Sequence, residues 1–201
     1  GKLLDDFIAQ FPNNADGYLR RANYYIAKGK DDQSWYDKAV DDFNRALKVA
    51  QKKDDAYYNI GKMMYSYQLS KPEKTYKDWT YDTALENVRQ AIAIDPLPVY
   101  IQMEGDILFA KQDYAGALAA YEKVNASNLA SPATFFSAAK TKELMQAPAE
   151  EVLALMDSCV ARFTQPYTEE AAPYLLERAQ ARMNADQARN AMLDYDAYYN
   201  A

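Results

Sequence analysis

The chain has 201 residues, of which 49% are hydrophobic and 26% charged, so it is expected to fold into one or two globular domains. It contains no histidine and one cysteine, which excludes histidine-dependent catalysis, histidine metal sites, intrachain disulfides and cysteine-rich zinc sites. Residues 1–100 carry 15 basic and 15 acidic residues, whereas residues 101–201 carry eight basic and 14 acidic residues, so the net charge of −6 lies entirely in the second half. An acidic chain repels the phosphates of nucleic acid, which disfavours nucleic acid as a partner.

The first element predicted is a single helix within residues 1–14. Leu4, Phe7, Ile8 and Phe11 follow the spacing of one helix face, and Pro12-Asn13-Asn14 ends the helix. Since no partner helix precedes it, we interpret this segment as the second helix of a repeat whose first helix is missing.

Most of the remaining chain repeats one pattern: a small residue, a second small residue further along, and a large residue four positions after the second. Because two helices can cross closely only where their side chains are small, the two small residues predict the crossing of a helical hairpin. In chain order the triplets are Ala22, Ala39 and Phe43; Gly61, Ala84 and Val88; Gly105, Ala117 and Tyr121; and Ala179, Ala191 and Tyr195. The small residues are 12 apart in the last two triplets but 17 and 23 apart in the first two, so the first two hairpins carry insertions. Residues 131–166 show the pattern weakly, with Ala139 in a first helix and Pro148 opening a second.

This pattern resembles the tetratricopeptide repeat (TPR) of bacterial TPR-domain proteins. The residues that carry the resemblance are Tyr18, Ala22, Tyr25, Gly29, Tyr36, Ala39, Phe43 and Ala46 in one repeat, Tyr57, Ile60, Gly61, Met64, Tyr81, Ala84, Ala91 and Pro96 in the next, and Gly105, Leu108, Tyr114, Ala117 and Tyr121 in the third. The resemblance implies an all-α fold, a right-handed superhelical solenoid of helical hairpins with about 11 helices. Arg21, Glu104 and Arg178 stand where the family usually has apolar residues, and we expect them to lie along the groove wall or to form ion pairs.

The resemblance further implies one solenoid domain over residues 1–201, and we expect this chain to be a fragment of a longer one. It divides into the second helix of a truncated repeat (1–14), repeat 1 with an insertion (15–52), repeat 2 with a long insertion (53–97), repeat 3 (98–130), a degenerate repeat 4 (131–166) and repeat 5 (167–201).

For function, the resemblance implies a non-catalytic scaffold that binds a protein or peptide through the concave groove of its first helices. No nucleophile–base pair, glycine-rich phosphate loop or metal-ligand spacing is evident, so we predict no catalytic, cofactor-binding or metal residues and no cofactor. Counting from the small residue of each first helix, the groove residues predicted are Arg20, Asn23, Tyr58, Asn59, Lys62, Tyr65, Gln102 and Asp106, with Leu19 at an equivalent position. Arg20 and Lys62 against Asp106 predict a polarised groove that suits a peptide with an acidic end.

The insertions at residues 31–35 and 70–80 contain Trp35, Tyr76 and Trp79. Two interpretations stay open for these aromatic residues. The two tryptophans could pack where the second helices begin, or the three side chains could form a second, partner-binding edge of the solenoid.

The alternative function is a glycan- or small-molecule-binding module of an exported bacterial protein, in which exposed Tyr and Trp stack on the ligand. The start at Gly1 without Met suggests an exported or periplasmic protein whose signal has been removed, with a cytoplasmic location as the alternative. No apolar run approaches the roughly 20 residues that cross a bilayer, so no membrane span is predicted.

The last predicted helix carries a stripe of mostly apolar residues along one face, namely Ala188, Ala191, Met192, Tyr195 and Tyr198. We predict that this stripe is partly exposed, or that a second copy of the chain covers it in a homodimer.

Overall fold

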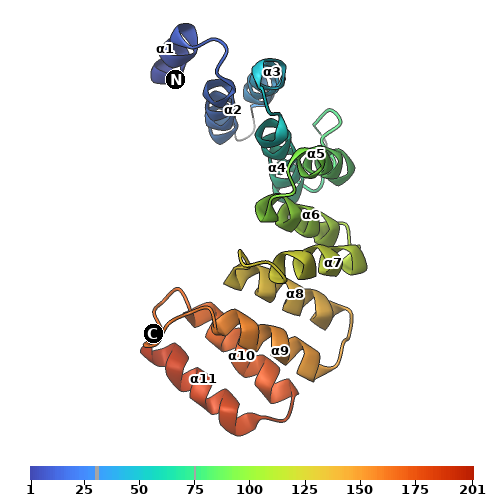
Figure 1. Ribbon diagram of the computed structural model, residues 1–201, viewed down its shortest axis with the longest axis vertical. Coiled ribbons are helices and arrows are strands. Elements are labelled where there is room, and N and C mark those ends of the chain that lie inside the picture. Colours follow the sequence, from blue (N-terminus) through green and yellow to red (C-terminus); the bar gives the residue numbers. More distant parts are fainter. Residues whose placement is uncertain (30–31, 75) are drawn as a thin grey trace. The chain divides into compact units, whose positions relative to one another are not determined.

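The computed structural model describes residues 1–29, 32–74 and 76–201, and within these ranges it contains eleven helices and no strand (Figure 1). The all-α class and the number of helices predicted from the sequence are therefore confirmed. The helices are α1 (Lys2–Gln10), α2 (Ala15–Gly29), α3 (Gln33–Val49), α4 (Asp54–Ser70), α5 (Tyr81–Ile94), α6 (Pro98–Ala110), α7 (Tyr114–Asn125), α8 (Pro132–Leu144), α9 (Ala149–Val160), α10 (Ala172–Asn184) and α11 (Ala188–Asn200). None of the described helices combines the length and apolarity that crossing a membrane requires.

The chain divides into two compact units, residues 1–100 (unit 1) and residues 101–201 (unit 2). The division falls inside α6, directly after Tyr100. It also separates the charge, because unit 1 is electrically balanced and unit 2 carries the whole excess of acidic residues. Each unit is described by itself below.

Small residues bring the paired helices of unit 1 into close contact. Ala22 on α2 and Ala39 on α3 are both fully buried. A Cβ atom on Gly61 of α4 would lie 2.7 Å from Val88 Cγ2 and 2.8 Å from the carbonyl oxygen of Ala84 on α5. Because a backbone carbonyl cannot move aside as a side chain can, this crossing requires the absence of a side chain at position 61.

The second insertion of unit 1 closes over the α3–α4 region with an aromatic cluster made of Tyr36, Tyr67, Tyr76 and Trp79. The ring of Trp79 lies 4.6 Å from that of Tyr76, 5.4 Å from that of Tyr67 and 5.7 Å from that of Tyr36, each in an edge-to-face arrangement. Trp79 is only 1% exposed and Tyr76 only 3%. Such edge-to-face contacts add to the burial of large apolar area, so this segment is part of the core of unit 1.

The same small-residue crossings build unit 2. Ala117 of α7, Ala179 of α10 and Ala191 of α11 are fully buried. A Cβ atom on Gly105 of α6 would lie 2.6 Å from Cε1 of Tyr121, so the tyrosine ring occupies the space that the glycine leaves. The pattern of small and large residues in the sequence thus corresponds to the contacts between these helices.

An arginine interrupts the apolar pattern of α2 and forms the first Arg–Asp bridge, defined as Arg21, Asp5 and Asp42. Arg21 Nε and Nη2 donate to the two carboxylate oxygens of Asp42 at 2.7 and 2.8 Å, and Nη1 donates to Asp5 of α1 at 2.7 Å. Asp42 is 3% exposed, and its hydrogen bonds are the largest cause that raises the pKa of Arg21 above its ordinary value. Arg21 therefore joins α2 to both neighbouring helices.

Unit 2 contains an equivalent arrangement, the second Arg–Asp bridge, defined as Arg178, Asp157 and Asp194. Arg178 Nε and Nη2 donate to the carboxylate of Asp194 at 3.0 and 2.6 Å, and Nη1 lies 3.5 Å from Asp157 of α9. Burial opposes the charge of Arg178, but the hydrogen bond to Asp194 and the negative charges of Asp194 and Asp157 together outweigh it and raise the pKa of Arg178. Of the two expectations for these arginines, ion-pair formation is the one observed.

The stripe of α11 is partly exposed. Ala191 is buried against the core, whereas Met192 is 60% exposed and Ala188 is also exposed. Tyr195 and Tyr198 are half-buried. That a second copy covers this stripe stays a prediction.

Replacing Ala117 with leucine is expected to lower the free energy of unfolding by about 1–3 kcal/mol, because three extra carbon atoms have no space at a fully buried crossing. Urea denaturation measures the change. The matched control is Ala119→Leu, the same substitution at an exposed position of the same helix, which should leave the stability nearly unchanged. Equal stability of the two variants would contradict the assigned crossing.

Candidate functional site

Polar residues form an exposed stripe on α2, the first helix of the first hairpin. Asp16, Arg20, Asn23 and Ala27 are all exposed and follow the spacing of one helix face. Arg20 Nε donates to Asp16 at 2.7 Å across one turn, and this hydrogen bond raises the pKa of Arg20. The predicted groove residues Arg20 and Asn23 therefore lie on the same face, which takes no part in packing α2 against α3.

The equivalent stripe of α4 contains Asp55, Asn59, Lys62 and Ser66. Lys62 is exposed, and its Nζ lies 5.8 Å from the centroid of the Tyr58 ring. Asn59 is half-buried and donates from Nδ2 to the carbonyl oxygen of Asp55 at 2.7 Å. Both stripes belong to unit 1, in which α2 and α4 contact each other.

The two predicted groove tyrosines of α4 lie beside its stripe and are half-buried. The Tyr58 ring packs against that of Tyr100, with centroids 4.8 Å apart and an angle of 34° between the planes. The Tyr65 ring lies 6.0 Å from that of Tyr81. Each tyrosine therefore has one role in packing and presents only part of its ring to a ligand.

The counting rule that selected the groove residues is wrong for Leu19. This residue stands three positions before the small residue of α2, and it is 7% exposed and belongs to the core of unit 1. Leu19 lies about one helical turn before the crossing and packs into the core of unit 1, whereas Leu176 at the same position of α10 is 42% exposed. Tyr58 occupies the equivalent position of α4 and is half-buried.

Gln102 and Asp106 lie on α6 in unit 2, and both are half-buried. Asp106 accepts a hydrogen bond from the Tyr121 hydroxyl at 2.8 Å. Burial raises the pKa of Asp106, and the hydrogen bond from Tyr121 only partly opposes this shift. Asp106 thus supports the packing of α6 on α7, and we do not assign it to the exposed acidic end of a groove.

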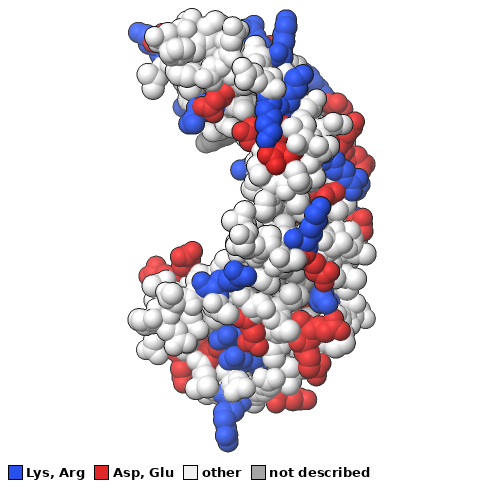
Figure 2. Space-filling model, in the orientation of Figure 1, with Lys and Arg blue, Asp and Glu red and all other residues white. Residues whose placement is uncertain are grey.

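We define the α2–α4 surface as Arg20, Asn23, Tyr58, Asn59, Lys62 and Tyr65, all of which belong to unit 1. Its charges are of both signs, because Asp16 and Asp55 lie on the same stripes as Arg20 and Lys62. Figure 2 likewise shows basic and acidic side chains interspersed on the visible face of both units.

The predicted second edge is corrected by the burial of two of its three aromatic residues. Tyr76 and Trp79 belong to the aromatic cluster, and the Tyr76 hydroxyl donates to Asp37 at 2.6 Å. Trp35 is half-buried between the Tyr25 ring at 5.6 Å and Lys38, whose Nζ lies 4.5 Å from the Trp35 ring. Packing, the interpretation given for the tryptophans, therefore holds for Trp79, and Tyr76 is buried beside it. Asp31 and Thr75 of the two insertions lie outside the described residues.

This burial removes the support that the two tryptophans gave to glycan binding. That alternative needs exposed aromatic faces that could stack on a sugar, and the ring of Trp79 is enclosed while that of Trp35 is already covered by Tyr25 and Lys38.

Sequence reasoning selected no residue from the first helices of unit 2 beyond α6. Counting one residue after Ala139 and Ala179 selects Lys140 on α8 and Gln180 on α10, of which Gln180 is exposed. Lys140 Nζ lies 2.6 Å from Glu143 and 3.2 Å from Glu177, so it joins α8 to α10. The weak pattern of residues 131–166 obscured Lys140. Gln180 stands next to Ala179, whose spacing is clear, so counting alone identifies it.

The described part of the chain contains no cluster of three or more metal-ligating side chains. Cys159 is fully buried, and burial raises the pKa of its thiol to about 12. A thiol in such surroundings stays protonated and is a poor nucleophile.

Neither a protein-family model nor a curated protein sequence matches this chain. Solved structures do match it. PilF of Pseudomonas aeruginosa is 18% identical with a TM-score of 0.69, and the match covers 92% of this chain and 75% of PilF. PilW, a type IV pilus biogenesis factor, is 20% identical with a TM-score of 0.68 over 98% of this chain and 83% of PilW. YrrB, a TPR protein with an unusual peptide-binding site, is 14% identical with a TM-score of 0.64 over 98% of this chain and 91% of YrrB.

Proposed function

Because this chain has the fold of tetratricopeptide-repeat proteins, we propose that it is a non-catalytic scaffold that binds a protein or peptide through the α2–α4 surface. YrrB shares the fold and has a peptide-binding site, and we carry a peptide-binding role to this chain as part of the proposal. The enzyme class has no support in the described residues, because they offer neither a reactive thiol nor a metal-ligand cluster.

The observation that carries the proposal is the pair of equivalent polar stripes on α2 and α4. Arg20, Asn23 and Lys62 are exposed, and none of them packs against the second helix of its hairpin. Tyr58 and Tyr65 add partly exposed rings beside them, and tyrosine combines a large contact area with a hydroxyl group. A surface of this composition suits recognition rather than packing.

The charges of this surface suggest the chemistry of the partner. Arg20 is held by Asp16 on its own helix, whereas Lys62 contacts the face of the Tyr58 ring. We therefore propose Lys62 as the main cation for an acidic residue of the partner, with apolar residues beside it for the two tyrosine rings.

Replacing Lys62 with glutamate is expected to reduce the amount of partner recovered from the native organism roughly tenfold, because charge reversal slows association and disfavours the complex. Quantitative pull-down with the wild-type chain as reference measures the change. Lys48→Glu is the matched control, since Lys48 is an exposed lysine on the second helix of the first hairpin, outside the α2–α4 surface.

Both variants change one exposed lysine, so both should keep the melting temperature of the wild type. If Lys62→Glu and Lys48→Glu recover the same partner equally well, the α2–α4 surface is not the binding site. Tyr58→Ala is a weaker test, because removing its ring also removes the contact with Tyr100.

A further inference from the structure

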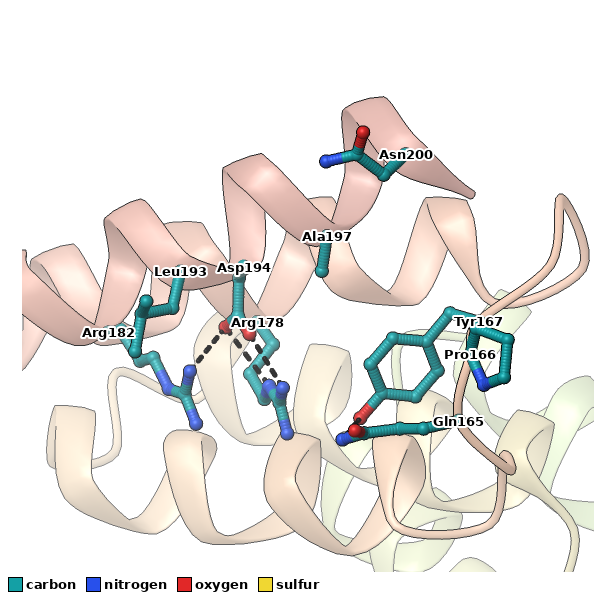
Figure 3. A pocket seen from close by; sticks show the side chains of 9 residues that line it. All are labelled: Gln165, Pro166, Tyr167, Arg178, Arg182, Leu193, Asp194, Ala197 and Asn200. Carbon is teal, nitrogen blue, oxygen red and sulfur yellow. Dashed lines mark hydrogen bonds and ion pairs between the residues drawn. The ribbon is translucent and has the colours of Figure 1, made fainter.

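Unit 2 contains a pocket of about 410 Å³ between α10, α11 and the loop that joins α9 to α10 (Figure 3). Its volume lies within the range of known ligand pockets, roughly 300–1,000 Å³. Arg178 and Arg182 line it from α10, Asp194 and Leu193 from α11, and Tyr167 from the loop. The pocket lies on another face of α10 than the exposed Gln180, and it shares no residue with the α2–α4 surface.

The lining holds two arginines but only one carboxylate. Asp194 accepts hydrogen bonds from Arg178 Nε and Nη2 at 3.0 and 2.6 Å, and it forms an ion pair with Arg182 Nη1 at 2.8 Å; Figure 3 shows these contacts as dashed lines. The three contacts involve both carboxylate oxygens of a side chain that is 3% exposed. The described lining therefore carries an excess of one positive charge.

The contacts that the two arginines make with Asp157 are long. Asp157, a half-exposed carboxylate outside the lining, lies 3.5 Å from Arg178 Nη1 and 3.3 Å from Arg182 Nη2. The Nε group of Arg182 is buried and has no hydrogen-bond partner among the described residues. Because a buried donor without an acceptor costs free energy, the fold does not fully satisfy the hydrogen-bonding groups of Arg182.

The first Arg–Asp bridge indicates what the fold itself requires. There Arg21 alone joins Asp5 and Asp42 through bonds of 2.7–2.8 Å, and the residue four positions later is Tyr25. In the second bridge, Arg182 stands four positions after Arg178. The hairpin of α10 and α11 therefore has one guanidinium group more than the equivalent bridge needs, and this group lines an open pocket.

We propose that this pocket binds a carboxylate group of a protein partner, held by Arg178 and Arg182 and the Tyr167 hydroxyl. Guanidinium groups that are 12% and 17% exposed bind carboxylates more strongly than fully hydrated ones. Leu193, which is 61% exposed, offers apolar contact to the residue next to the carboxylate. The carboxylate can come from an Asp or Glu side chain or from a chain terminus, and the proposal goes beyond the α2–α4 surface.

The test uses the full 201-residue chain and short synthetic peptides, followed by NMR titration of the arginine Nε–Hε signals. Acetyl-Ala-Leu-Glu-Leu-Ala-amide and the same peptide with Gln in place of Glu differ only by the carboxylate. Acetyl-Ala-Leu-Leu with a free or an amidated terminus tests the second source. We expect the acidic member of at least one pair to bind roughly tenfold or more tightly than its neutral partner and to shift the signals of Arg178 and Arg182.

Two variants locate the site. Arg182→Tyr introduces the residue found at the equivalent position of the first bridge, so the Arg178–Asp194 pair is kept and the preference for the acidic peptide should disappear. Arg189→Tyr makes the same substitution at an exposed position of α11 outside the pocket and should change nothing. Lys62→Glu should also leave peptide binding here unchanged, which separates this proposal from the proposed function.

Equal binding of acidic and neutral peptides in both pairs, or no binding of either, would overturn the proposal. This comparison is made on the wild-type chain, so it holds even if Arg182→Tyr does not fold. An Arg182→Tyr chain that folds and keeps the preference for the carboxylate would overturn it as well.

Discussion

Replacing Asp194 with alanine is expected to lower the free energy of unfolding by about 3–5 kcal/mol, because two buried arginines then lose their shared carboxylate. Asp194 accepts two hydrogen bonds from Arg178 and forms an ion pair with Arg182 at 2.8 Å, and its side chain is 3% exposed. Asp157 cannot replace it, since Asp157 lies 3.3–3.5 Å from the two guanidinium groups and is half-exposed. Urea denaturation followed by circular dichroism measures the loss.

Asp42→Ala is the matched control for this prediction. It removes the equivalent carboxylate of the first Arg–Asp bridge, but Arg21 keeps a bond of 2.7 Å to Asp5. The expected loss is therefore smaller than that of Asp194→Ala. A double variant with leucine at both positions 21 and 42 should recover much of the stability, because a well-packed apolar pair can replace a buried ion pair. If Asp42→Ala is the more destabilising of the two single variants, the account of the two bridges is wrong.

Replacing Trp79 with alanine is expected to cost about 3–5 kcal/mol of unfolding free energy, since it removes the largest fully buried side chain of the described core. The rings of Tyr36, Tyr67 and Tyr76 would lose their edge-to-face neighbour and border a cavity. The measurement is thermal and urea unfolding of the variant beside the wild type.

Trp35→Ala provides the comparison with the other tryptophan of the chain. Trp35 is half-buried and contacts only one ring and one lysine among its described aromatic and cation contacts. Its removal should therefore cost clearly less than the removal of Trp79. Equal losses would contradict the assignment of Trp79 to the core and Trp35 to the margin of unit 1.

The positions of the helices followed from periodicity and from the small residues at the crossings. The pair Gly105 and Tyr121 illustrates this, because a missing side chain on one helix and a ring 16 residues later on the next meet in the structure. Exposed stripes could be predicted for the same reason, and Arg20, Asn23 and Lys62 do lie on them. Leu19 was misplaced because the position along the helix does not by itself decide burial: Leu19 packs into the core of unit 1, whereas Leu176 at the same position of α10 is 42% exposed.

What the sequence by itself determined is the all-α class, the number of helices and the faces on which their residues lie, since helical spacing is local. What only the tertiary structure decided is which groups meet across those faces. Asp42 is 21 residues from Arg21, and the Tyr76 hydroxyl donates to a carboxylate 39 residues away. Periodicity predicts which residues share a face with an arginine or a tryptophan on its own helix. The charged group or ring that contacts this side chain belongs to a segment far away in the sequence. The ion pairs, the burial of Trp79 and the two-arginine pocket depend on that distant partner, so they could be read only from the packed helices.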